Sequence, residues 1–372
     1  MTCDVAILGA GIVGAACARA LANAGMRVTV IDGRGIAGGA TAAGMGHITV
    51  MDDSEAQFAL TSYSQQLWNE LSEQLPDDAE YVKTGTLWLA ADDDEMAAAR
   101  AKHAYYEARG VATEVLDAWA LAEAEPNLRP GLTGALRVVN ESVIYPPCAA
   151  RWLLEQARQQ GATLALGQPV VQIDGALLRI HDGTTFSCGS MVHATGTWAA
   201  ELFPGLPIRP RKGHLVITDR YPGFARHQLV ELGYLKSAHG HTTESVAFNL
   251  QPRRTGQMLL GSSRQFDVLH KDVEPRMLNR MVARALAYMP RLAGLSAIRT
   301  WTGFRAATPD SLPLIGPAEV DRHYLATGHE GLGITTSLGT AELVACHLTG
   351  RSSAIPGLPY LPSRFKKGAP HG

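Results

Sequence analysis

The sequence lacks a strong excess of charge of either sign, and it lacks a long apolar segment. Its 372 residues include 33 Lys and Arg against 35 Asp and Glu, which gives a formal net charge of -2. This balance excludes a strongly basic nucleic-acid-binding protein and a strongly acidic disordered chain. Val5–Ala18 and Gly35–Met51 carry no charge, but glycines interrupt the first, and Gly, Ala and Thr dominate the second. We therefore expect no membrane-spanning helix and no nucleic acid partner.

Cysteine is scarce and scattered, and the N-terminus lacks the features of a secretory signal. No two of the five cysteines form a CxxC pair or show iron–sulfur spacing; they are Cys3, Cys17, Cys148, Cys188 and Cys346. We interpret them as reduced thiols that serve as small buried side chains, and we expect no metal site. Asp4 comes early and the first basic residue is Arg19, which favours a cytoplasmic protein.

Length and pattern predict an α/β protein whose chain opens with a βαβ unit. A chain of 372 residues suggests two domains or one large interrupted domain. Asp4–Leu8 is a short apolar run typical of a buried strand, and Ile12–Ala24 follows with helical spacing and ends before Gly25. A second strand is expected over Arg27–Ile31 and ends at Asp32.

Further along the chain, helices alternate with strands, and short strands follow one another after residue 162. We expect helices from Ser54 to about Leu75 and over Asp92–Ala108, Pro147–Gln160, Val273–Tyr288 and Ile334–Leu348. We expect strands over Tyr81–Ala91, Thr163–Leu166, Pro169–Ile173, Leu177–His181, Thr184–Ser187, Met191–Ala194, Ala297–Arg305 and His323–Ala326, and a loop over Gly35–Gly46.

A glycine-rich turn between the first strand and helix predicts a dinucleotide site. In Gly9-Ala10-Gly11-Ile12-Val13-Gly14, Gly9 permits the tight turn and Gly11 lets the backbone approach a pyrophosphate. Gly14 allows close packing of helix on strand, and the helix N-terminus then faces the phosphates with free N–H groups. Asp32 ends the second strand, where its carboxylate accepts from ribose hydroxyls and repels the 2′-phosphate of NADP.

The order of the later elements favours FAD over NAD. The third parallel strand arrives only after more than 100 residues, whereas an NAD enzyme usually continues with further βα units. Val170 lies where a backbone contact to adenine is expected, and Ala194-Thr195-Gly196 is a small-residue turn suited to a second close approach. Gly328–Gly333 precedes the last helix, whose N-terminus can stabilise negative charge on a flavin ring.

These motifs resemble those of the D-amino acid oxidase family of FAD-dependent amine oxidoreductases. The resemblance runs from Asp4 to about Gly350, and its carriers are the Gly9–Gly14 turn with Asp32, Thr41–Met45, Ala194–Gly196, Gly303-Phe304-Arg305 with Thr308-Pro309-Asp310, and Gly328-His329 with Gly333-Ile334. Ala42–Met45 looks most like glycine oxidase, and Gly44–His47 is similar to flavin subunits of D-hydroxyproline dehydrogenase. The resemblance implies a Rossmann-like FAD-binding domain (1–80, 140–210 and 300–372) interrupted by an α+β substrate domain with a mixed sheet (81–139 and 211–299).

The resemblance also implies which residues meet the cofactor. The expected FAD contacts are Gly9, Gly11, Ile12, Val13, Gly14, Asp32, Gly33, Thr41, Ala42, Ala43, Gly44, Met45, Val170, Ala194, Thr195, Gly196, Gly331, Leu332, Gly333, Ile334 and Thr335. Some sarcosine oxidases tether the flavin through a Cys shortly before the Thr-Pro-Asp motif. Residues 301–304 contain no Cys, so we expect noncovalent FAD.

Three residues are candidates for the chemistry, each with an alternative reading. Arg305 matches the arginine that anchors the substrate carboxylate in the family, and a guanidinium offers a bidentate fork; the alternative is a salt bridge between domains. His47 follows the flavin loop and either faces the flavin or only bonds its own loop. Tyr234 belongs to the pocket or is an ordinary sheet tyrosine. His329 is expected to shape its turn, and Gly331 stands where some glycine oxidase-like proteins carry Arg.

The function implied is oxidation of a small amino or imino acid to its imine, with hydride transfer from Cα to flavin N5. A D-hydroxyproline or D-proline type of substrate is favoured, and glycine or sarcosine is an alternative. A dehydrogenase is favoured over an oxidase, which implies partner subunits that accept the electrons. Two other readings stay open: a flavin domain acting on a modified tRNA base, and a non-catalytic FAD-binding subunit.

Overall fold

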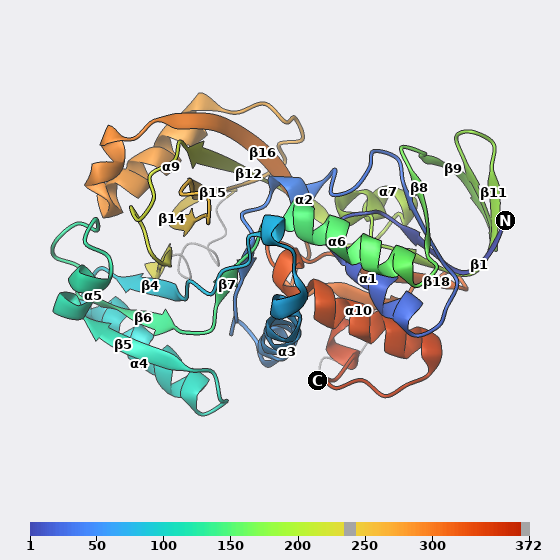
Figure 1. The fold of residues 1–372 in the computed structure, drawn as a ribbon, viewed down its shortest axis with the longest axis horizontal. Coiled ribbons are helices and arrows are strands. Elements are labelled where there is room, and N and C mark those ends of the chain that lie inside the picture. The colour runs from blue at the N-terminus through green and yellow to red at the C-terminus, as the bar shows by residue number, and fades with distance from the viewer. Residues whose placement is uncertain (234–242, 366–372) are drawn as a thin grey trace.

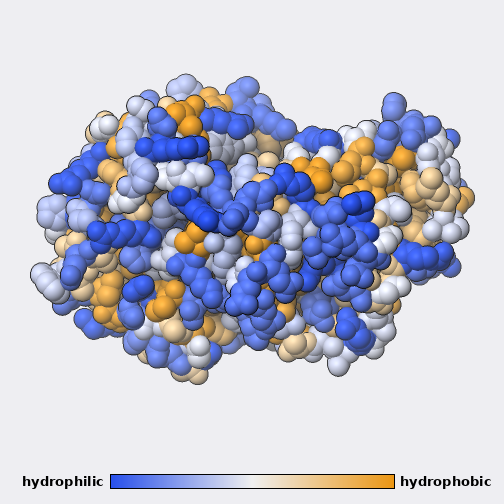
Figure 2. All heavy atoms as spheres, viewed as in Figure 1, coloured by the Kyte–Doolittle hydropathy of each residue, from blue (hydrophilic) through white to orange (hydrophobic). Residues whose placement is uncertain are grey.

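The computed structural model describes residues 1–233 and 243–365, and it is built on two eight-stranded mixed sheets. Figure 1 shows the two sheets side by side along the long axis of the molecule, with helices α2 and α3 near their junction. Within the described ranges, no helix is long and apolar enough to cross a membrane. On the face drawn in Figure 2, hydrophilic side chains predominate and hydrophobic ones gather only in small groups.

The first sheet is formed around a parallel core. Its strands run in the order β17-β18-β11-β1-β2-β8, with β10 and β9 continuing from β11. The bounds are β1 Thr2–Leu8, β2 Val28–Asp32, β8 Thr163–Leu166, β9 Val170–Asp174, β10 Leu177–Ile180, β11 Thr185–His193, β17 Leu314–Pro317 and β18 His323–Thr327. Leu8 lies beside Ile31 on one side and His193 on the other. The carboxyl ends of β1, β2 and β11 therefore meet at one edge, where α/β sheets bind their ligands.

Four helices cover one face of this sheet and bury its main hydrophobic core. They are α1 Ile12–Asn23, α3 Glu55–Leu71, α6 Pro146–Gln159 and α10 Gly333–Thr349. Helix α1 packs against α6 and α10, and α10 packs against α3 (Figure 1). Local chemistry fixes their starts: Ser54 caps α3 by accepting from the Gln57 amide at 3.1 Å, and Pro146 opens α6. Two short helices, α2 Ala40–Ala43 and α7 Ala199–Leu202, lie outside this layer.

The second sheet is mostly antiparallel, in the order β16-β12-β15-β14-β13-β4-β6-β5. Its strands are β4 Thr86–Ala90, β5 Thr113–Asp117, β6 Gly134–Val138, β12 Arg209–Thr218, β13 Gln228–Glu231, β14 Glu244–Pro252, β15 Met258–Phe266 and β16 Ala297–Ala307. Helices α4 Asp93–Glu107, α5 Ala118–Ala124 and α9 Pro275–Tyr288 accompany it. A small ribbon, β3 His47–Ile48 with β7 Ser142–Val143, lies between the two sheets (Figure 1).

The two mixed sheets confirm the expected α/β class, while several element bounds differ from the sequence-based predictions. Thr185–His193 is one continuous strand rather than two. Gly189 does not break it, because an added Cβ there would lie 2.7 Å from the Asp4 carbonyl of β1 and the glycine permits this close pairing. Helix α3 ends at Leu71 and passes into a 3₁₀ turn, and part of the expected loop over Gly35–Gly46 is helix α2.

Candidate active site

The turn after β1 is a cradle that only glycine can form. Gly9 has a φ of 111°, and a Cβ there would lie 2.5 Å from the Ala194 carbonyl oxygen after β11. A Cβ at Gly14 would overlap the Gly9 carbonyl and lie 3.3 Å from the Ala194 Cβ. Helix α1 therefore packs directly onto β1 and β11, as the Gly9–Gly14 motif predicts. Gly11 caps α1 without a side chain, which leaves the positive end of the helix open to an anion.

Asp32 is held at the carboxyl end of β2 by three backbone amides. Its Oδ2 accepts from the Ala10 amide at 2.8 Å, and its Oδ1 accepts from the amides of Arg34 and Gly35 at 2.7 and 3.0 Å. These bonds orient the carboxylate beside the β1–α1 turn, and its remaining lone pairs can still accept from ribose hydroxyls. A Cβ at Gly33 would lie 3.0 Å from the Cβ of Pro169, so the residue preceding Val170 is adjacent.

Residues 41–45 run from the N-terminus of α1 to the second sheet. The Thr41 hydroxyl accepts from the Ile12 amide at 3.0 Å. The Ala43 carbonyl accepts from the indole Nε1 of Trp301 on β16 at 3.3 Å. Met45 reaches β15, where its sulfur would lie 3.0 Å from a Cβ on Gly261. The predicted flavin loop is thereby held by helix α1 and by the second sheet.

The N-terminus of α10 meets the same loop. The Ile334 Cδ1 would lie 3.1 Å from a Cβ on Gly44. The Thr335 hydroxyl donates to the His47 carbonyl at 3.0 Å and accepts from the Thr49 amide at 3.2 Å. Gly331 lies beside Arg305, since a Cβ there would be 3.8 Å from the arginine Cδ and Nε. The structure thus brings the segment before and at the start of α10 into contact with both the predicted flavin loop and Arg305.

His47 is neutral in this environment. Burial lowers the pKa of its imidazole to about 3. Its Nε2 is buried and has no hydrogen-bond partner among the described residues, although such atoms normally have one. An unpaired buried nitrogen beside the flavin loop is a natural contact point for a bound ligand. The backbone of His47 is fixed by pairing of β3 with β7 and by Thr335.

Arg305 lies on β16 of the second sheet and forms no ion pair within residues 1–233 and 243–365. Its Nη1 donates to the Ser263 carbonyl at 3.1 Å. Its cross-strand neighbour Arg211 forms the ion pair instead, with Glu330. Burial raises the carboxyl pKa of Glu330, but the nearby Arg211, Arg305 and Arg264 outweigh burial and hold it below its ordinary value. Among the described residues, Arg305 therefore does not form the salt bridge between domains that was the alternative reading.

The other candidates divide into a turn residue and one that is not described. His329 bonds the Thr340 hydroxyl at 2.9 Å through Nε2, and burial lowers its pKa to about 3, which suits a residue that shapes the turn. Tyr234 lies outside the described residues. Sequence reasoning missed Gly213, Trp301 and Glu330. The signal for Gly213 was a glycine inside a strand, which indicates close approach of another group.

The arrangement fits FAD. The glycine cradle supplies backbone donors for a pyrophosphate, Asp32 can accept from ribose, and Thr195 adds a buried hydroxyl oxygen without a partner in the described part of the chain. The unpaired Nε2 of His47 and the N-terminus of α10 lie where the flavin end is expected. These groups are spread from β2 to the second sheet, which suits a long dinucleotide rather than a small anion.

Comparison with known proteins gives the same picture. Residues 4–347 match the family model described as DAO, FAD dependent oxidoreductase. Glycine oxidase of Pseudomonas aeruginosa is 29% identical over 96% of this chain and 98% of its own, and hydrogen cyanide synthase subunit HcnC of the same organism is 28% identical over 98% and 97%. Among solved structures, glycine oxidase from Geobacillus kaustophilus superposes with a TM-score of 0.88 at 25% identity, covering 98% of this chain and 99% of that one. L-Proline dehydrogenase from P. horikoshii gives 0.87 at 27%, covering 98% of each chain.

The glycine cradle, the loop over residues 41–45 and this match over nearly the whole length agree on one cofactor and one class of enzyme. The predicted resemblance and the predicted FAD are confirmed. The chain belongs to the DAO family of FAD-dependent oxidoreductases.

Proposed function

We propose that this enzyme oxidises the Cα–N bond of a small amino or imino acid that carries a carboxylate. One observation carries the proposal: Arg305 lies beside Gly331, just before the α10 N-terminus, and forms no ion pair in the described part of the chain. Gly303, two residues earlier on β16, lies against Ala43 of the flavin loop. A buried or half-buried cation of this kind is normally paired, and an amino acid carboxylate supplies the partner. The named relatives act in the same sense, as a glycine oxidase and a proline dehydrogenase.

Within this class we favour a cyclic D-amino acid of the D-hydroxyproline or D-proline type. The Gly44–His47 resemblance supports that choice, and glycine or sarcosine is the second candidate. Gly331 stands where an Arg would favour glycine, and the structure places this position against Arg305. The absence of a side chain there leaves more room above the guanidinium than an Arg would.

The protein's share of the chemistry is binding and orientation. Bound FAD would supply the hydride acceptor, held by the Gly9–Gly14 cradle, Asp32, the Thr41–Met45 loop and the α10 N-terminus. Arg305 binds the substrate carboxylate and so aims the Cα–H at the flavin. His47 and His329 stay neutral at physiological pH, so neither carries a positive charge that would repel a protonated amine. No strong general base is needed when the amine binds in its neutral form.

We also propose that electrons leave to a partner subunit rather than to O2. The word "subunit" in the name HcnC supports an assembly, and this chain has no iron–sulfur cysteine spacing of its own. The tRNA-base and non-catalytic alternatives are less favoured, because the charge is -2 and because Arg305 and the flavin loop are intact. The domain division, the cytoplasmic location, noncovalent FAD and the roles of individual site residues stay predictions.

The test is an anaerobic titration of the yellow protein, followed at 450 nm. D-Proline, D-hydroxyproline, glycine and sarcosine are added separately. Bleaching by one of them supports an amino or imino acid substrate, and the rate of bleaching ranks the four. Colour without bleaching by any of the four would favour a macromolecular substrate or a non-catalytic FAD-binding subunit over the proposed function.

A further inference from the structure

Three glycines on neighbouring strands of the second sheet each accommodate one group of the active site. Gly213 on β12 lies directly opposite Gly303 on β16, and Gly261 lies on β15. A Cβ at Gly303 would lie 2.5 Å from the Ala43 Cβ, and one at Gly261 would lie 3.0 Å from the Met45 sulfur. Both therefore admit the flavin loop. Gly213 admits a different group.

Gly213 provides the space in which the Arg305 guanidinium lies. A Cβ on Gly213 would be 2.6 Å from Nη1, 2.8 Å from Nη2 and 2.9 Å from Cζ of Arg305. The arginine starts on β16, passes over β12 at Gly213 and reaches β15, where Nη1 donates to the Ser263 carbonyl. A side chain at position 213 would displace the guanidinium from this path, because contacts under 3.0 Å require a shift and the flexible end of the arginine moves more easily than the strand backbone.

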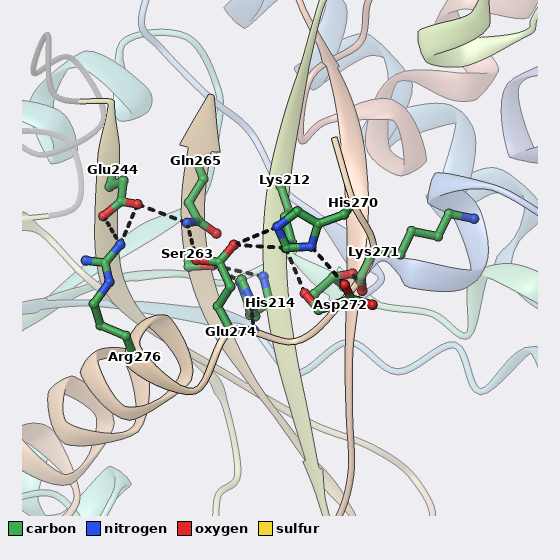
Figure 3. A network of polar contacts seen from close by, with 11 residues as sticks. Lys212, His214, Glu244, Ser263, Gln265, His270, Lys271, Asp272, Glu274 and Arg276 are labelled. Carbon is green, nitrogen blue, oxygen red and sulfur yellow. Dashed lines mark hydrogen bonds and ion pairs between the residues drawn. The ribbon is translucent and has the colours of Figure 1, made fainter. Parts of the chain in front are cut away.

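Lys212 and His214, on either side of Gly213, belong to a network of polar contacts with Ser263, Asp272 and Glu274 (Figure 3). Lys212 is fully buried and donates to the Asp272 carbonyl at 2.7 Å and to the Glu274 carboxylate at 3.1 Å. Side chains of successive strand residues alternate between the two faces of a sheet. Lys212 and His214 therefore lie on one face, and position 213 lies on the other, which is the face of the Arg305 guanidinium.

His214 ties the same network to Ser263. Its Nε2 accepts from the Glu274 amide at 3.1 Å, so the ring proton is on Nδ1, which donates to the Ser263 hydroxyl at 2.8 Å (Figure 3). Burial, aided by the Lys212 charge, lowers the pKa of His214 to about 4 and keeps the ring neutral. The His214 amide also donates to the Ser263 hydroxyl at 2.9 Å. His214 thereby fixes Ser263, whose carbonyl accepts the hydrogen bond from Arg305.

We propose that Lys212-Gly213-His214 positions Arg305 for the substrate carboxylate, and that Gly213 is a positioning residue that acts through the guanidinium. The inference rests on the proposed role of Arg305 and extends it to residues that act through the arginine side chain. It assigns different roles to two glycines that are paired across β12 and β16. Gly213 leaves space for the Arg305 guanidinium, and Gly303 leaves space for Ala43 of the flavin loop.

The first experiment compares single methyl groups. Gly213→Ala is expected to raise KM for the amino acid by about tenfold or more, with a smaller change in kcat and with FAD retained. Gly303→Ala is expected to weaken FAD binding instead, because its methyl meets Ala43. Gly294→Ala, in a 3₁₀ turn with open space around it, is the matched control and should change neither quantity. Equal KM effects in all three variants, or FAD loss in Gly213→Ala, would overturn the assignment.

A double-mutant cycle tests whether the methyl acts through the guanidinium. If it does, Gly213→Ala should have little further effect on KM in an Arg305→Leu background. If Gly213→Ala changed KM by the same factor in both backgrounds, the positioning role of Gly213 would be refuted while the role of Arg305 would stand. An Arg305→Leu variant with normal KM would instead refute the proposed function itself.

His214 gives a second route that does not alter the glycine. His214→Asn keeps an N–H near the position of Nδ1, whereas His214→Leu does not. KM for the amino acid should therefore rise more in the Leu variant than in the Asn variant, with the flavin spectrum unchanged in both. Equal KM values in the two variants would contradict the proposed link from His214 through Ser263 to Arg305.

Discussion

Replacing Arg305 by Leu tests the central claim that this side chain binds the substrate carboxylate. In the structure its guanidinium donates one hydrogen bond to the Ser263 carbonyl and forms no ion pair in the described part of the chain, although the Glu330 carboxylate is near enough to interact with its charge. Most of its five N–H donors therefore remain for a ligand. Loss of one partner of a close, shielded charge pair costs about 2–5 kcal/mol. Because Arg305 is only partly buried, we expect the lower part of that range, about 2–3 kcal/mol, or about a thirty- to hundredfold loss in kcat/KM.

Steady-state kinetics with an artificial electron acceptor measures this loss. KM should rise, and kcat should fall because a loosely held substrate aims its Cα–H less often at the flavin. Arg305→Lys should recover only part of the activity, since one ammonium cannot reproduce the guanidinium fork. Arg299→Leu, on an exposed position of the same strand, is the control and should behave as the wild type. Normal kcat/KM in Arg305→Leu, or loss of its flavin, would refute the reasoning.

Three further predictions concern the cofactor and the pH dependence of stability. Asp32→Ala should lower FAD affinity by about ten- to a hundredfold, because a charge-assisted hydrogen bond is worth about 1.5–3 kcal/mol. Fluorescence titration of the apoprotein with FAD measures the affinity, and an unchanged Kd would show that Asp32 does not bind FAD. Acid precipitation should release all yellow colour into the supernatant, whereas colour in the pellet would contradict noncovalent binding. Burial raises the pKa of Glu141 to about 7, so between about pH 4.5 and 7 the native state binds a proton that the unfolded state has lost. The free energy of unfolding should therefore fall as the pH rises through this range. Urea unfolding should show this fall, of up to about 3 kcal/mol, in the wild type and not in Glu141→Gln; parallel pH profiles would contradict it.

The features predicted correctly from sequence are those that depend on neighbours in the chain. The Gly9–Gly14 turn, Asp32 at the end of a strand and the final helix are each encoded within a few residues, since backbone freedom, strand length and helical spacing are local properties. The family resemblance then ordered these pieces around FAD. The break expected within residues 185–193 was wrong, because Gly189 packs closely against Asp4 of β1, a strand far away in the sequence.

Only the tertiary structure decided which distant residues meet. The register of β12 with β16 puts Gly213 under Arg305, and the order of the second sheet brings the Ser263 carbonyl within reach; neither pairing leaves a trace in local composition. Burial likewise decided that His47 is neutral, because a pKa depends on the solvent that the folded chain excludes. The sequence by itself determined the cofactor motif and the type of chemistry, since both rest on short contiguous segments. The position of Arg305, the proposed substrate-binding cation, was decided by non-local strand pairing, which no short segment encodes.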